Sequence, residues 1–288
     1  MRLTTPPCAP LLIAAVLTAT ACGSSAPSAA PSVSDSSPTE ADPLVGVIAI
    51  GHSGLTGEGT AGRLEAALDN SWATGTNPEV NSVYLRLSDR RPENSGHVAN
   101  TAQGGAVSDS LVVQAESALQ KVPHPLLVII STIDNDIRCD GSDAEHLPEF
   151  GDNVANALTV ISTASPESTI LVVGQPGRPS VDFVRTLVAH DPAVKRAMSG
   201  SGPCDFFNRD GNLVADNFQT LTGIIDDYET EQAERCAIVP RCHTDGGARA
   251  AYVDTLENFS SDWAHLNIRG QAAEAELIWP VVESILEL

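Results

Sequence analysis

Three short apolar runs, at residues 44–50, 126–130 and 169–173, constrain the fold of this chain most strongly. Each run is continuous and rich in β-branched residues, which is typical of a strand that is buried on both faces. Stretches with the apolar spacing of helices separate the runs. Buried strands that alternate with helices predict a parallel sheet with helices covering both of its sides.

The remaining elements follow from the same spacing. We expect helices at residues 60–68, 107–122, 149–163, 181–190, 193–198, 213–234 and 270–286, with Pro280 kinking the last one or capping its second half. Residues 83–87 fit a short strand or a helix, and residues 251–256 fit a further strand. The insertion at residues 203–242 carries three cysteines and predicts a disulfide-pinned cap over one end of the sheet.

The first 43 residues predict export. Arg2 precedes an apolar run at residues 11–20 that is too short to span a membrane, so residues 1–21 are expected to be a signal peptide. Ala19, Thr20 and Ala21 directly before Cys22 resemble the bacterial lipobox, in which the cysteine is lipidated and begins the mature protein. Ala19 stands where Leu is usual, and ordinary secretion, with Cys22 free or removed, is the alternative.

The segment that follows has a different composition. Residues 22–43 are mostly Ser, Ala and Pro, too polar to bury a core, and predict a disordered tether. Residues 44–288 then form the folded domain. Together with Cys22, this predicts a lipoprotein that is anchored to a bacterial cell membrane and faces outside, or else a secreted protein.

The charge of the chain limits its partners. It has 37 Asp and Glu against 16 Lys and Arg, a formal net charge of −21. A nucleic-acid partner is not expected, because no basic run could displace counterions from phosphates. Electrostatic binding to anionic lipid headgroups is disfavoured for the same reason. Neutral or weakly cationic substrates fit better, although solubility alone also explains the acidity. The oligomeric state is not predicted.

Four cysteines follow the tether: Cys139, Cys204, Cys236 and Cys242. An even number in an exported domain favours two disulfides, and of the three possible pairings we expect Cys139–Cys204 and Cys236–Cys242. No close CxxC spacing supports zinc. The acidic stretch from Asp134 to Asp143 fails the calcium-loop pattern, since Arg138 and Leu147 occupy ligand positions. We therefore expect neither a metal nor another cofactor.

Polar residues at the carboxyl ends of the predicted strands suggest acyl-transfer chemistry. Ligands of open parallel sheets bind at that edge. Ser53, in a turn after the first strand, offers a nucleophilic hydroxyl and a backbone N–H. Asp262 lies three residues before His265, so its carboxylate can orient the imidazole as a general base. Gly105 offers a backbone N–H and Asn135 a side-chain amide to stabilise an oxyanion.

These segments, in this order, resemble the SGNH hydrolase superfamily, the GDSL-type esterases and lipases, from residue 48 to about residue 270. The resemblance implies a three-layer α/β/α, flavodoxin-like fold with a parallel sheet of about five strands. It implies that Ser53 is the nucleophile and first oxyanion donor, that His265 is the base, and that Asp262 orients it. Gly105 and Asn135 would complete the oxyanion hole. Asn100 would brace the nucleophile loop.

The chain departs from the family pattern in two blocks. His52 and Gly54 flank Ser53 where the family has Asp and Leu, so this would be a divergent member. Ile133 and Asp134 replace two glycines before Asn135, and an acid there could change the potential of the oxyanion pocket. Trp263, between the two residues of the acid–base pair, could line the substrate pocket or simply pack.

The expected function is hydrolysis of carboxylic esters through an acyl-enzyme. The substrate would be a small ester, a lipid or an acylated glycan. A carbohydrate O-deacetylase or an acyltransferase acting on envelope glycans or lipids is an alternative, because the same residues serve both provided that the site excludes water. A second alternative is a binding module that kept the fold and lost turnover.

Overall fold

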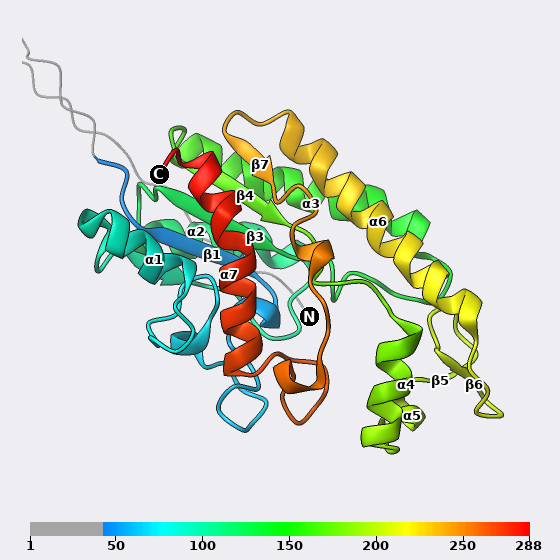
Figure 1. The fold of residues 1–288 in the computed structure, drawn as a ribbon. Coiled ribbons are helices and arrows are strands. Elements are labelled where there is room, and N and C mark those ends of the chain that lie inside the picture. Colours follow the sequence, from blue (N-terminus) through cyan, green and yellow to red (C-terminus); the bar gives the residue numbers. More distant parts are fainter. Residues whose placement is uncertain (1–42) are drawn as a thin grey trace, which may run out of the picture. The chain divides into compact units, whose positions relative to one another are not determined.

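The computed structural model describes residues 43–288. The predicted signal peptide, Cys22 and the tether up to residue 42 lie outside the described residues. A five-stranded sheet forms the centre of the described part, with strand order β2-β1-β3-β4-β7 and every neighbouring pair parallel (Figure 1). The strands are β1 (Val47–Gly51), β2 (Val98–Asn100), β3 (Leu127–Ser131), β4 (Thr169–Val173) and β7 (Cys242–Thr244). The predicted fold class is confirmed.

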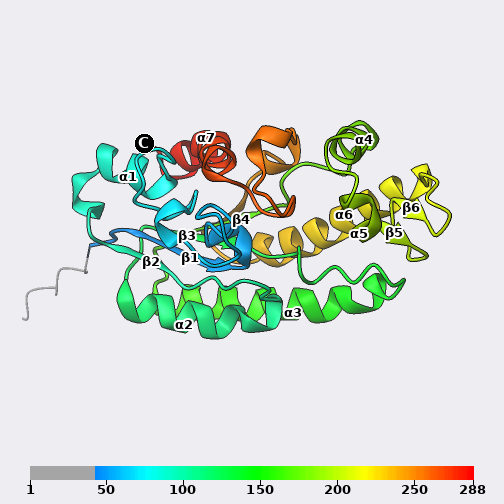
Figure 2. The same cartoon turned by 90° about the horizontal axis from the view of Figure 1, so that it is seen from below.

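Helices cover both faces of this sheet because the strands are apolar on both faces. Successive strand residues point to opposite sides. Ile48, Ile130 and Val172 therefore face α2 (Leu111–Lys121), α3 (Asp143–Ala164) and α6 (Ala215–Ala237), whereas Val47, Ile129 and Val173 face α1 (Val83–Arg90) and α7 (Ile268–Ile285). Figure 2 shows α2 and α3 on one side of the strands and α1 and α7 on the other.

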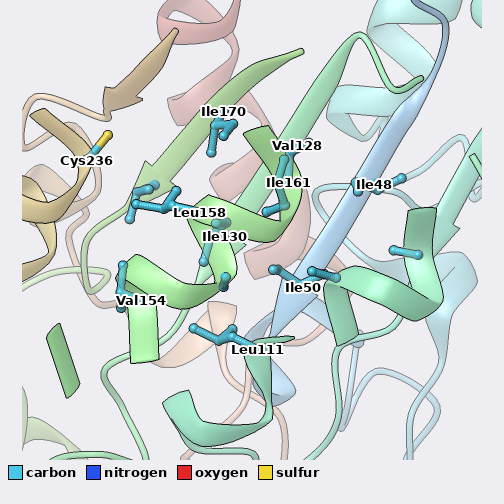
Figure 3. Packing of buried hydrophobic residues seen from close by; sticks show 14 of the residues in the cluster. Ile48, Ile50, Leu111, Val128, Ile130, Val154, Leu158, Ile161, Ile170 and Cys236 are labelled. Atoms are coloured by element: carbon cyan, nitrogen blue, oxygen red, sulfur yellow. The ribbon is translucent and has the colours of Figure 1, made fainter. Parts of the chain in front are cut away.

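The packing on the α2–α3 side is dense. Leu111 from α2 and Val154, Leu158 and Ile161 from α3 lie against the strand residues, and each of the four is completely buried (Figure 3). Burial of aliphatic side chains of this size contributes roughly 1.5–3 kcal/mol each. The core therefore holds the strands, and with them the loops at their carboxyl ends, in place.

Several local predictions need correction. Residues 60–68 form mostly turns and bends instead of a helix. Residues 252–255 are irregular instead of a strand, and they lie between two short 3₁₀ helices, Arg249–Ala251 and Leu256–Asn258. The fifth strand is β7, whose three residues include one of the disulfide cysteines. Of the two alternatives for residues 83–87 the helix is confirmed, since they belong to α1. Pro280 lies inside α7, which continues to Ile285. Among residues 43–288, no helix is both long and apolar enough to cross a membrane.

The cap begins earlier in the chain than predicted, at residue 181, and ends before α6. It contains α4 (Val181–His190), α5 (Val194–Ala197) and the two-stranded sheet of β5 (Ser199–Gly200) and β6 (Phe207–Asn208), which lie together at one end of the domain (Figure 1). Much of the 203–242 segment is instead α6, which packs on α3. The two expected disulfides are present: Cys139–Cys204 ties the cap to the loop after β3, and Cys236–Cys242 ties α6 to β7.

Candidate active site

The turn that carries Ser53 begins at a glycine. Gly51, the last residue of β1, has φ 140°, and a Cβ there would lie 1.7 Å from the carbonyl oxygen of Ser131, so no other residue fits. The side-chain amide of Gln114, on α2, binds this glycine twice: its Oε1 accepts from the Gly51 N–H at 2.6 Å, and its Nε2 donates to the Gly51 carbonyl at 3.1 Å. Ser53 then starts a 3₁₀ helix, Ser53–Leu55.

The structure brings Ser53, His265 and Asp262 together. The Nδ1–H of His265 donates to Asp262 Oδ2 at 2.6 Å, and His265 Nε2 lies 3.0 Å from Ser53 Oγ. The carboxylate fixes the proton on Nδ1, which leaves Nε2 free to accept the serine hydroxyl proton. This is the geometry of a nucleophile, its base and the group that orients the base.

Asp262 is held in its ionised form. Burial alone would raise its pKa, but hydrogen bonds from His265, from the Ser260 hydroxyl at 2.6 Å and from the backbone N–H groups of His265 and Ala264 lower the pKa to about 2. The carboxylate therefore stays charged at any pH near neutrality. A charged partner keeps the imidazole in one tautomer and stabilises it when it becomes an imidazolium.

The two backbone N–H groups that were predicted as oxyanion donors are unpaired in the described part of the chain. The N–H groups of Ser53 and Gly105 have no hydrogen-bond partner within residues 43–288. Gly105 has φ 71° and is exposed, a conformation that favours glycine. The Nδ2 of Asn100 donates to the Leu55 carbonyl and to Thr74 Oγ1, both at 2.8 Å, so this side chain contacts the end of the 3₁₀ helix that begins at Ser53.

Asn135 is placed differently from the other predicted donors. Its side-chain Nδ2 donates to the Ala106 carbonyl at 3.0 Å, so one of its two N–H groups joins the loop after β3 to the loop that carries Gly105. Ile133, where the family has glycine, adopts φ 98° and is completely buried. A β-branched residue in this region is strained. Its side chain packs in the core on the α2–α3 side, which offsets the strain.

Sequence reasoning missed Glu58. Its Oε1 lies 4.0 Å from His265 Nε2, and its Oε2 lies so close to Gly104 that a Cβ there would be 2.6 Å away. A second carboxylate thus lies near the imidazole of His265, on the side of Nε2, whereas Asp262 binds Nδ1. The signal was Glu58 between two glycines, five residues after the nucleophile, but an acid in a glycine-rich loop ordinarily indicates no more than a solvated turn.

A buried ion pair that connects to the turn of Ser53 was also missed. Arg249 binds Glu274 of α7, with the shortest nitrogen–oxygen distance 2.8 Å, and donates to Ser131 Oγ at 2.9 Å and to the Gly174 carbonyl at 2.7 Å. Ser131 Oγ lies 3.4 Å from His52 Nε2. On the other side of the ring, His52 Nδ1 accepts the Gly54 N–H at 3.1 Å, which places the ring proton on Nε2. A polar chain thus connects α7 to the turn of Ser53.

His52 remains neutral in the fold. Burial lowers its pKa from 6.5 to about 4, with Asp134 opposing the shift and Arg249 and His265 adding to it. Between these two pH values the unfolded chain binds a proton that the folded chain does not, so stability falls as the pH falls through this window. Between pH 7 and pH 5, we expect the free energy of unfolding of wild type to fall by about 2 kcal/mol more than that of His52→Asn. The asparagine keeps an acceptor for the Gly54 N–H.

Urea unfolding of the two proteins at both pH values measures this difference, and titration of the acidic side chains common to both cancels in it. Equal losses of stability in the two proteins would show that His52 is not the group that takes up the proton.

A cavity of about 510 Å³ adjoins the loop that carries His265. Trp263, Ala264 and Leu266, which flank the histidine in sequence, form part of its wall, and the cap and α6 contribute Phe183, Met198 and Ile225. Trp263 therefore lines a pocket, and its Nε1 donates to Asp191 at 3.1 Å. Most of the lining is apolar. The volume is in the range of small-molecule binding sites.

Comparisons with known proteins identify the fold. No protein-family model and no curated protein matches this chain. Among solved structures, an extracellular lipase from Streptomyces rimosus aligns with a TM-score of 0.52 at 14% identity, over 84% of this chain and 100% of the lipase. Phospholipase A1 from Streptomyces albidoflavus NA297 aligns with a TM-score of 0.50 at 14% identity, over 84% and 99% of the two chains. The chain has the fold of SGNH hydrolase structures.

Proposed function

We propose that this chain is an exported serine hydrolase that cleaves carboxylic esters. The observation that carries the proposal is the hydrogen-bonded series Ser53, His265 and Asp262 at the carboxyl edge of a parallel sheet. His265 takes the hydroxyl proton as Ser53 Oγ attacks the ester carbonyl, and the N–H groups of Ser53 and Gly105 stabilise the oxyanion. His265 then gives the proton to the departing alcohol. Water, activated by His265, releases the acid.

The apolar lining of the cavity favours an ester with an apolar acyl chain over an acetyl ester. Each methylene that leaves water for an apolar site contributes about 0.8 kcal/mol. An acyl chain of several carbons would gain this free energy on burial in the cavity, and an acetyl group would gain little of it. The apolar wall includes Phe183, Leu187, Met198 and Ile225. The carbohydrate O-deacetylase and the acyltransferase remain the alternatives, since the same three residues would serve them.

Export and lipidation of Cys22 are part of the proposal. Two disulfides support a location outside the cytoplasm, where they persist. The lipid would tether the domain to the outer face of a membrane through residues 23–43. Intact mass of the mature protein from a membrane fraction tests this part: an unmodified Cys22 would remove the anchor from the proposal.

We expect the mature domain to hydrolyse p-nitrophenyl esters and to prefer hexanoate and decanoate to acetate by about tenfold or more in kcat/KM, because the longer chains bury methylenes in the cavity. Initial rates on the series measure this preference. A preference for acetate, or for acetylated sugars, would favour the deacetylase. Rates equal to those of the uncatalysed reaction on every ester would refute ester hydrolysis and leave the acyltransferase and the binding module.

A further inference from the structure

The cavity beside His265 is unusually aromatic for this chain. Aromatic residues make up only 4% of the sequence, twelve in all, yet five of them line this cavity. They come from the cap and from the segment before α7: Phe183, Phe206, Tyr252, Phe259 and Trp263. Faces of aromatic rings attract cations as well as apolar groups, because their π systems are negative at the face.

The same wall carries a carboxylate without a partner. Asp254 makes no hydrogen bond and no ion pair with any residue from 43 to 288. Burial, with a contribution from the charge of Glu274, raises its pKa to about 6, so the ionised form is disfavoured but still predominates at neutral pH. A charge that is partly desolvated and unpaired costs free energy, and a ligand that supplies the missing partner recovers it.

Nothing else in the lining neutralises Asp254. The other acid in the wall, Asp134, adds a second negative charge and accepts a hydrogen bond from Gln175 at 2.8 Å. Arg178 is the one cation among the residues that line the cavity, and its guanidinium is bound by Asp226 and Glu229 on α6. The cavity is therefore apolar, aromatic and negatively charged.

We propose that this cavity binds an amphiphilic ester whose apolar part carries a positively charged, ammonium-type group, with the cation placed at Asp254 between the aromatic rings. The proposal rests on the ester hydrolysis proposed above and narrows its substrate class. A neutral chain would fill the apolar part but leave Asp254 without a partner, and an anionic chain would be repelled. The net charge of −21 would also concentrate cations near the domain.

Binding can be measured without turnover in the Ser53→Ala protein. We would titrate it by calorimetry with three molecules that share an eight-carbon chain: octyltrimethylammonium, 1-octanol and octanoate. We expect the ammonium compound to bind at least about tenfold more tightly than 1-octanol, and octanoate to bind most weakly. Asp254→Asn in the same background should weaken binding of the cation by about tenfold to a hundredfold and narrow its advantage over 1-octanol.

The matched control is Asp89→Asn on α1, which removes the same charge from an exposed position outside the cavity. It should leave the order of the three affinities, and the ratios between them, unchanged. Wild-type enzyme adds a second readout: octyltrimethylammonium should inhibit hydrolysis of p-nitrophenyl hexanoate competitively, and Asp254→Asn should raise its inhibition constant by the same factor as its dissociation constant.

The outcomes separate this inference from the proposed function. Equal affinities for the cation and the alcohol, or an advantage of the cation that Asp254→Asn leaves intact, would overturn the cation site even if esters are hydrolysed. A cation preference that depends on Asp254, in a protein that hydrolyses no ester, would support the site and refute the hydrolase.

Discussion

Replacement of Ser53 by alanine is expected to lower kcat for ester hydrolysis by a factor of about 10⁴ to 10⁶. In the proposed mechanism the Ser53 hydroxyl, which lies 3.0 Å from His265 Nε2, forms the acyl-enzyme. Its loss removes covalent catalysis while the backbone N–H of residue 53 remains. Steady-state rates with p-nitrophenyl hexanoate measure the loss, and an exposed serine, Ser95→Ala, is the control that should keep wild-type activity.

A double variant shows whether the residues act as a unit. His265→Ala should cost about as much as Ser53→Ala, and the variant that carries both changes should be no slower than either alone, because a base without its nucleophile has nothing to activate. Unfolding temperatures of all variants should remain near that of wild type, since Ser53→Ala removes a single oxygen atom and the side chain of His265 is partly exposed. Multiplicative losses in the double variant would contradict the relay from Ser53 to His265.

The parts of the site that sequence could predict are those in which residue type and position carry the chemistry. Three apolar runs locate the central strands, and parallel strands bring their carboxyl ends to one edge, so Ser53 and the segment after β3 had to be neighbours. Asp262 and His265 are local to each other in sequence. Their distance to Ser53 depends on the path of the chain after β7, and the apolar pattern of the sequence does not predict that path.

The parts that sequence could not predict depend on tertiary contacts. The three residues of β7 are too few for a periodic pattern, and they become a strand because β4 offers its edge. Arg249 and Glu274 look like ordinary surface charges, and only the fold removes them from water together. The contact of the Asn135 amide with the Ala106 carbonyl also depends on how two loops meet, and it leaves the second N–H of the amide for the predicted oxyanion role.

The buried pair is nevertheless expected to dominate local stability. Arg249 is 1% exposed and Glu274 is completely buried, and burial raises the pKa of Glu274 while the guanidinium opposes that shift. Removal of one partner leaves the other charge buried without compensation. Arg249→Met should therefore lower the free energy of unfolding by about 3–5 kcal/mol, and it should also release Ser131, which contacts His52 behind the nucleophile.

Substitution of both partners should restore most of that loss. Arg249→Met with Glu274→Met removes the two charges together, and we expect the double variant to be at least about 2 kcal/mol more stable than Arg249→Met alone, because no unpaired charge remains. Urea unfolding at pH 7 measures all three proteins. The exposed pair Arg269 and Glu257, with both side chains 68% exposed, is the control: Arg269→Met should change stability by less than about 1 kcal/mol. A double variant as unstable as Arg249→Met would show that the lost contacts with Ser131, Gly174 and Trp72, and not the unpaired carboxylate, cause the loss.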